Sequence, residues 1–131
     1  YYFRDNCRAD SGLIAALVVL EQLSQAGVPL SELRRPFERY AASGELNQEV
    51  PDPRAIIDRV AEHYADADQD RLDGLTVDLG HWWFNLRPSN TEPLLRLNLE
   101  APDADSCARH VAEVNDVIGA AASSLPEGTD T

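Results

Sequence analysis

Four polar side chains follow one another in the middle of the chain, and together they have the chemistry of an anion site. Arg87 offers a planar fork of N–H donors, and Ser89 and Thr91 offer hydroxyl groups. Between them, Asn90 offers an amide and tolerates the left-handed backbone angles of a tight loop. Guanidinium binds phosphate oxygens bidentately, and successive backbone N–H groups in a loop add partial positive charge. These residues therefore predict a phosphate-binding loop.

The same residues also fit an ordinary turn. Pro, Ser and Asn are common in connections between strands, and Pro88 and Pro93 both lie in this one. A hairpin loop without a ligand is therefore the alternative interpretation. Arg96, just beyond the loop, also has two interpretations. It supports the loop as a nearby positive charge, or it forms a surface ion pair that contributes little to stability.

Apolar and polar residues alternate on both sides of the loop, which is the pattern of strands with one buried face. The segments 82–87 and 95–100 show this alternation most clearly. Pro88 ends the first of them, because proline has no backbone donor and restricts the residue before it. The segment 75–79 predicts a third strand, and 45–50 predicts a fourth, weaker one.

Two helices are predicted among these strands. One begins at Asp52–Pro53, where the aspartate caps the helix and proline suits its first position. The other begins at Pro102–Asp103. The resulting order is strand, helix, three strands, helix. It predicts an α+β domain over 41–122, with an antiparallel sheet of about four strands covered on one side by two helices.

The residues on either side of this domain are predicted to be separate pieces. Residues 1–40 contain a helix from Ser11 to about Ala26 and then a second, short helix. The small residues Ala41–Gly44 predict the boundary between the two parts. Residues 123–131 are polar, and we expect them to form a disordered tail.

Other clusters of ionisable residues do not predict a metal or catalytic site. The run Asp66–Asp70 is rich in aspartate, but the chain lacks the glycine and glutamate that a calcium loop needs after it. We expect this run to be a solvated connection. His63, His81 and His110 are scattered, without the spacing of metal ligands. No specific metal site is therefore expected in this chain, and no catalytic triad can be read from the order of these residues.

Trp82, Trp83 and Phe84 raise the question of sugar stacking. Neighbouring residues of a strand point to opposite faces, so at least part of this cluster belongs to the core. We favour core packing over ligand contact, because aromatic residues in strands are usually packed inside.

The net charge of −12, from 11 basic and 23 acidic residues, disfavours nucleic acids and anionic membranes as partners. No run is apolar and long enough to cross a bilayer. Without a secretory signal, Cys7 and Cys107 are expected to be reduced thiols in a cytoplasmic protein. The chain begins with Tyr1 and contains no methionine, so we expect a fragment or a processed product.

Two segments resemble the α-D-phosphohexomutases, and most closely their phosphomannomutase/phosphoglucomutase branch. Residues 87–96, preceded by 82–85, resemble the phosphate-binding loop of that family. Residues 1–12 resemble the segment that follows the family's sugar-recognition loop. The two motifs occur in the family's order, and the resemblance extends from Tyr1 to about Gly119.

The resemblance implies that 1–40 are the last helices of the family's third domain, an α/β domain. It implies that 41–122 form the fourth domain, which has a fold like that of the TATA-box-binding protein. In this family a phosphoserine donates its phosphoryl group to a sugar monophosphate, and the bisphosphate turns round and returns a phosphoryl group. The fourth domain binds the phosphate that does not react, which gives this role to Arg87, Ser89, Asn90 and Thr91.

The resemblance further implies that the full-length enzyme uses Mg²⁺, held by another domain, and that this chain works with the family's N-terminal domains. No segment matches the catalytic serine or the metal loop, so we expect the chain alone to be inactive. Asn90 favours mannose and glucose phosphates, because glucosamine-specific mutases usually have glycine there. The competing hypothesis is a free-standing module that binds an anion or a partner without catalysis.

Overall fold

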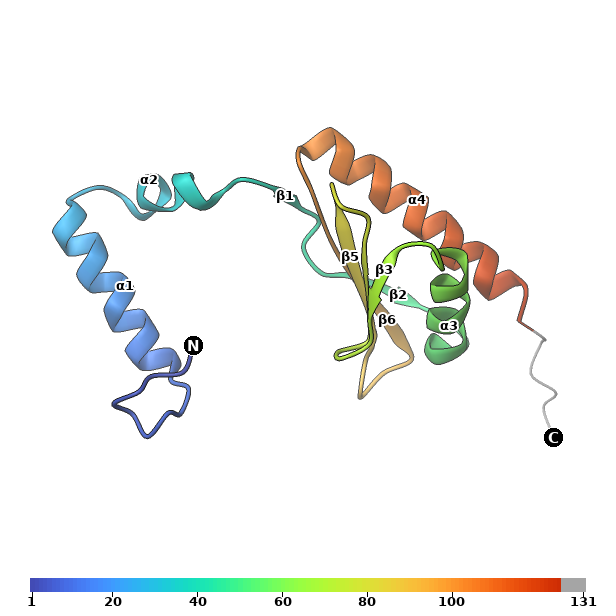
Figure 1. Cartoon of the computed structure of the whole chain (residues 1–131), viewed down its shortest axis with the longest axis horizontal. Coiled ribbons are helices and arrows are strands. Elements are labelled where there is room, and N and C mark those ends of the chain that lie inside the picture. Colours follow the sequence, from blue (N-terminus) through green and yellow to red (C-terminus); the bar gives the residue numbers. More distant parts are fainter. Residues whose placement is uncertain (126–131) are drawn as a thin grey trace. The chain divides into compact units, whose positions relative to one another are not determined.

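The computed structural model describes residues 1–125. They divide into two compact units, with the division between Arg39 and Tyr40 (Figure 1). The small-residue stretch Ala41–Gly44, where a boundary was predicted, begins just after this division. The assignment of the two units to consecutive domains of a larger enzyme stays a prediction.

The first unit contains the two helices expected there. Helix α1 (Gly12–Ala26) begins at Ser11, whose hydroxyl accepts a backbone hydrogen bond from the first turn. It ends at Gly27, which adopts a left-handed φ of 63°. Helix α2 (Leu30–Arg34) follows and continues into a short 3-10 turn, η1 (Arg35–Phe37).

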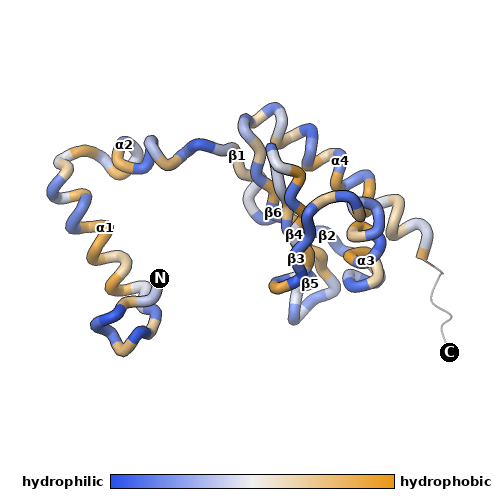
Figure 2. Tube along the Cα trace, viewed as in Figure 1, coloured by the Kyte–Doolittle hydropathy of each residue, from blue (hydrophilic) through white to orange (hydrophobic). Residues whose placement is uncertain are grey.

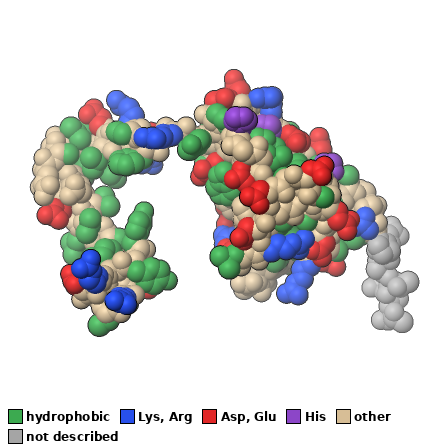
Figure 3. Space-filling model, in the orientation of Figure 1, with side chains coloured by type: hydrophobic (Ala, Val, Ile, Leu, Met, Phe, Trp, Pro, Cys, Tyr) green, Lys and Arg blue, Asp and Glu red, His purple; other side chains and the backbone are tan. Residues whose placement is uncertain are grey.

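The helices of the first unit have no buried residue, although α1 is rich in apolar side chains (Figures 2 and 3). Leu13 is 74 % exposed, and Leu17 and Leu20 are each 57 % exposed. Exposed apolar side chains in this number are typical of a surface that contacts another protein. Within residues 1–125, no single helix is both long and apolar enough to span a membrane. In the same residues, α1 and the segment Leu30–Phe37 reach the required length and apolar composition when they are taken together, but the chain bends by 103° between them.

The second unit is built on a six-stranded antiparallel sheet. The strands are arranged in the order β1–β6–β5–β4–β3, and β2 also pairs with β6. Their bounds are β1 (Ala41–Ala42), β2 (Leu46–Glu49), β3 (Asp68–Asp70), β4 (Leu75–Asp78), β5 (Trp83–Pro88) and β6 (Leu94–Ala101). The predicted α+β fold with an antiparallel sheet is confirmed, and the four predicted strands correspond to β2, β4, β5 and β6.

Two strands were missed. Strand β1 has only two residues, too few to show alternation. Strand β3 lies in the aspartate-rich run that was interpreted as a solvated connection, and this interpretation is wrong for Asp68–Asp70. The strand is at the edge of the sheet, where the two aspartates are exposed. Charged residues are common on such edges because they prevent pairing with other chains.

Two helices cover one face of the sheet, as predicted (Figure 1). Helix α3 (Pro53–His63) begins at Asp52, whose carboxylate accepts two backbone hydrogen bonds of 3.0 Å from the first turn. Helix α4 (Ala104–Ser123) begins at Asp103, whose carboxylate accepts from the backbone N–H of Ser106 at 2.8 Å.

The core lies between these helices and every second residue of the strands. Eight strand residues are at most 1 % exposed, namely Leu75, Val77, Phe84, Leu86, Leu95, Leu97, Leu99 and Ala101. The neighbouring positions point to the other face of the sheet, which the helices leave open. The candidate polar residues of β5 and β6 therefore lie on this open face.

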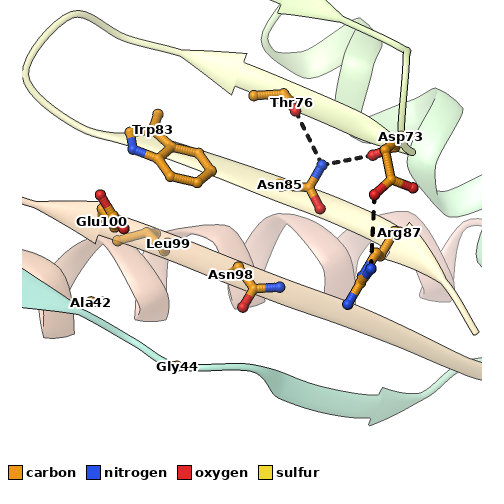
Figure 4. A pocket seen from close by; sticks show the side chains of 10 residues that line it. All are labelled: Ala42, Gly44, Asp73, Thr76, Trp83, Asn85, Arg87, Asn98, Leu99 and Glu100. Carbon is orange, nitrogen blue, oxygen red and sulfur yellow. Dashed lines mark hydrogen bonds and ion pairs between the residues drawn. The ribbon is translucent and has the colours of Figure 1, made fainter. Parts of the chain in front are cut away.

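The aromatic cluster is divided between the two faces, as the strand period requires. Phe84 is fully buried, and Trp82 packs against the core and stacks on His110 with ring centroids 4.0 Å apart. Core packing was predicted, and these two residues confirm it. Trp83 lies on the open face of the sheet (Figure 4).

The C-terminal end of α4 lies further along the chain than expected. The helix runs to Ser123, Ser124 hydrogen-bonds to Arg59, and Leu125 packs against the core. The predicted start of a disordered tail at 123 is therefore wrong for these three residues. The rest of the predicted tail, 126–131, lies outside the described residues.

Gly74, in the turn between β3 and β4, lies directly against the backbone that carries Arg87. Its φ is +75°, and a Cβ built on it would lie 2.2 Å from the carbonyl oxygen of Leu86 and 2.8 Å from Cβ of Arg87. Such distances are too short for any side chain. Because glycine has no side chain, the turn can pack directly against the backbone of Leu86 and Arg87.

Replacement of Gly74 by alanine is expected to destabilise the second unit more than the same change at Gly80. Both glycines have positive φ, which costs an L-residue about 1–3 kcal/mol. Only Gly74 has close neighbours, and overpacking adds about 1–3 kcal/mol. Urea unfolding followed by fluorescence of Trp82 and Trp83 measures both variants in the second unit. Equal losses of unfolding free energy would contradict the close packing.

Candidate functional site

The predicted phosphate loop is the connection between β5 and β6. Its base is fixed by a 2.8 Å hydrogen bond from the backbone N–H of Ser89 to the carbonyl oxygen of Leu94. The hydroxyl of Ser89 also accepts a 3.4 Å hydrogen bond from the backbone N–H of Thr91. Ser89 is half-buried, whereas Asn90 and Thr91 are exposed at the tip. The loop is thus anchored at its base and presents two polar side chains to solvent.

Arg87 and Arg96 lie directly opposite each other on β5 and β6. Both point to the open face of the sheet, and their side chains are 37 % and 32 % exposed. Like charges at directly opposed positions of an antiparallel pair repel each other. The pair therefore needs a negative group nearby, either from the protein or from a ligand.

Glu45 supplies this negative charge from the protein. Its carboxylate accepts a 2.8 Å hydrogen bond from Nη2 of Arg87, and its other oxygen lies 3.4 Å from Nη1 of Arg96. The hydrogen bond from Arg87 and the charges of both arginines hold the pKa of Glu45 below its usual range, against the opposing effect of burial. Glu45 is thus ionised at neutral pH and bridges the two guanidinium groups.

Glu45 reaches the arginines because the strand that carries it is interrupted. β1 and β2 both pair with β6, and residues 43–45 form the break between them. Ser43 maintains the pairing, since its N–H donates to the carbonyl oxygen of Leu99 and its hydroxyl accepts from the N–H of Leu99, both at 2.9 Å. Gly44 then adopts a φ of 68°, and Glu45 follows it.

The network continues beyond Glu45 on both sides. Nη2 of Arg96 lies 3.4 Å from the hydroxyl of Ser89, and Nη1 of Arg87 lies 3.8 Å from the carboxylate of Asp73. A line of polar contacts therefore connects the turn before β4 with the base of the loop. Within residues 1–125, the Nε atoms of Arg87 and Arg96 are shielded from solvent and have no hydrogen-bond partner.

Asn85 holds the turn that supports Arg87. Its side-chain amide donates to the carbonyl oxygen of Asp73 at 2.8 Å and to the hydroxyl of Thr76 at 3.1 Å (Figure 4). Trp83, Asn85 and Arg87 follow one another along one side of β5. They line an open groove of about 470 Å³ on this face of the sheet.

The structure brings three of the predicted site residues into one network, namely Arg87, Ser89 and Arg96. Asn90 and Thr91 lie on the same loop, with their side chains directed to solvent rather than into that network. Arg96 combines both of the interpretations considered for it, because it contacts the loop through Ser89 and forms an ion pair with Glu45.

Three residues of the network were not predicted: Glu45, Asp73 and Asn85. The polar face of β5 and β6 was predicted, and two arginines on one face are a signal that a carboxylate is near. The sequence alone did not indicate which carboxylate, because the break between β1 and β2 was not recognised.

The part of the chain that the structure describes has no group of three or more His, Cys, Asp or Glu side chains placed to hold a metal ion. Cys7 is exposed and Cys107 is buried, and the two are not joined. The loop itself offers guanidinium, hydroxyl and amide groups, which are hydrogen-bond donors suited to an anion.

Known proteins are similar to this chain in both sequence and fold. A family profile described as "Phosphoglucomutase/phosphomannomutase, C-terminal domain" matches residues 45–117. The phosphomannomutase of Methanocaldococcus jannaschii is 40% identical over 125 residues, covering 95% of this chain and 28% of that protein. The phosphomannomutase of Salmonella montevideo is 46% identical over 104 residues, covering 77% of this chain and 23% of that protein.

A solved structure agrees with these matches. The phosphoglucomutase/phosphomannomutase family protein of Burkholderia thailandensis superimposes with a TM-score of 0.69 at 26% identity, covering 95% of this chain and 27% of that one. The chain thus spans only about a quarter of the length of its relatives. Since the profile extends from Glu45 through the loop and into α4, the chain belongs to the phosphoglucomutase/phosphomannomutase family and contains its C-terminal domain.

Proposed function

We propose that this chain is the substrate-phosphate-binding part of a phosphohexomutase that interconverts the 1-phospho and 6-phospho forms of mannose or glucose. Relatives that carry the name phosphomannomutase support the reaction class. The observation that carries the proposal is the paired Arg87 and Arg96 at the base of an exposed loop rich in hydrogen-bond donors.

Each loop residue has a role in this proposal. Arg87 donates two parallel hydrogen bonds to the phosphate, and the hydroxyls of Ser89 and Thr91 donate to its remaining oxygens. Asn90 contributes its amide from the tip of the loop. These contacts act on a phosphate far from the reacting end, so their binding energy serves to orient the sugar and to close the site.

The proposed site binds an anion although the chain as a whole is negatively charged. The net charge is −12, so long-range attraction does not bring a phosphate to this surface. Binding must come from short contacts with the two arginines and the loop. This requirement favours a small phosphorylated ligand and disfavours nucleic acids and anionic membranes, whose binding needs extended positive surfaces.

The remaining chemistry belongs to other parts of the full-length protein. We propose that a phosphoserine there donates its phosphoryl group to the sugar monophosphate and later recovers one from the bisphosphate. Mg²⁺, which supports this transfer, would be held there too, since residues 1–125 offer no cluster for it. What this chain does is bind and orient the phosphate that does not react.

The first unit supports a role within a larger enzyme. The apolar side chains of α1 are largely exposed, as expected of a helix whose packing partner lies in another part of the protein. A free-standing module would leave this surface in water. A cytoplasmic location and a preference for mannose or glucose phosphates, the latter indicated by Asn90, stay predictions.

A titration of the chain with inorganic phosphate and with mannose 1-phosphate, followed by backbone amide NMR, tests the proposal. Saturable shifts are expected at residues 87–91, centred on the loop. Replacement of Arg87 by alanine is expected to weaken binding by about 10- to 100-fold, because it removes charge-assisted hydrogen bonds.

Arg109→Ala is the matched control. Arg109 lies on α4, which covers the opposite face of the sheet, and its guanidinium contacts Ser106. This variant is expected to bind phosphate like the wild type. Shifts that are absent at saturating ligand, or that persist unchanged in Arg87→Ala, would overturn the proposal.

The chain alone is expected to show no mutase turnover, because no segment of it matches the catalytic serine. A coupled assay with mannose 1-phosphate measures this, with a full-length phosphomannomutase as the positive control. Turnover above background by the purified chain would show that the chemistry does not need the missing part.

A further inference from the structure

The bridge between Arg87 and Arg96 carries an inference about Glu45. We propose that Glu45 is a positioning residue of the phosphate site: its carboxylate holds the guanidinium of Arg87 in the orientation that meets the phosphate. This inference rests on the proposed function of the loop, and Glu45 is given no contact with the ligand.

The geometry favours a structural bridge over a chance ion pair. One carboxylate contacts two arginines from two different strands, at 2.8 Å and 3.4 Å. Arg87 and Arg96 are cross-strand partners, so without a carboxylate between them their charges would push the two side chains apart. Glu45 is itself only 34 % exposed, whereas Asp73, the other acidic neighbour of Arg87, is 79 % exposed and lies 3.8 Å away.

The backbone around Glu45 adds to this argument. Ser43 holds the chain against β6 on one side of the break, and Leu46 pairs with Leu97 on the other. The backbone is thus held against β6 on both sides of Glu45. A carboxylate on a fixed backbone limits the rotamers of the long, flexible arginine side chain that it contacts.

Removal of the carboxylate has two opposing effects on phosphate binding. It leaves the site more positive, which strengthens the attraction of an anion. It also frees the side chain of Arg87, so that phosphate binding must bear the entropy cost of ordering that side chain. Arg87 is partly exposed, so solvent screens the first effect, whereas the loss of order acts in full. We therefore expect binding to become weaker.

The test measures the Kd of inorganic phosphate for the whole chain in four forms. These are the wild type, Glu45→Gln, Arg87→Ala and the double variant. Glu45→Gln is expected to raise Kd by about tenfold, which corresponds to the loss of order of one arginine side chain. In the Arg87→Ala background the same change is expected not to weaken binding any further, because Glu45 orders the site through Arg87.

A spectroscopic readout separates positioning from a general loss of structure. The side-chain Nε–H signal of Arg87 is expected to broaden or shift in Glu45→Gln, while amide signals of the core strands stay in place. Glu45→Asp, which keeps the charge, is expected to recover part of the affinity. Glu49→Gln, the same change on β2 opposite Leu94, is the control and is expected to leave Kd unchanged.

Weaker binding in Glu45→Gln together with non-additivity in the double variant supports the proposal. Unchanged or tighter binding in Glu45→Gln overturns it, since the carboxylate would then be neutral or would compete with phosphate. Full additivity of the two changes also overturns it. If Arg87→Ala itself leaves Kd unchanged, the loop assignment fails first.

Discussion

The register between β5 and β6 is the constraint on which the candidate site depends. Leu86 lies opposite Leu97 beneath the helices, so the next pair, Arg87 and Arg96, lies on the open face. A shift of one residue would turn one of the two strands over, burying its guanidinium group and exposing its leucines. Each buried leucine contributes about 1.5–3 kcal/mol, whereas an exposed ion pair contributes about 0–1 kcal/mol. Core packing therefore determines on which face of the sheet the two arginines lie, and the ion pairs with Glu45 only orient their guanidinium groups.

Much of the second unit could be predicted because local signals and burial agree. The aspartates before α3 and α4 cap these helices, and the alternation over 95–100 coincides with the buried residues of β6. The parts that failed lack such agreement. A two-residue strand has no period, and Asp68–Asp70 owes its strand to pairing with β4 rather than to its own residues. Such pairing is a tertiary effect that local propensity does not report.

The site was predictable as far as it lies on one hairpin. Arg87, Ser89 and Arg96 are close in sequence, and strand parity places the two arginines on one face. Glu45 is different, because it is brought to Arg87 from 42 positions earlier in the chain by the break between β1 and β2. The loop motif contains the groups proposed to contact the phosphate. The contact of Glu45 with Arg87 and Arg96 becomes visible only in the folded structure.

A phosphate titration of Arg87→Lys separates the charge of Arg87 from its geometry. If the planar fork of Arg87 binds the phosphate, lysine cannot replace it, since lysine keeps the positive charge but has no fork. Isothermal titration of the chain with inorganic phosphate is therefore expected to give a Kd at least about tenfold higher for this variant. An unchanged Kd would contradict binding by the fork, because positive charge alone would then be enough.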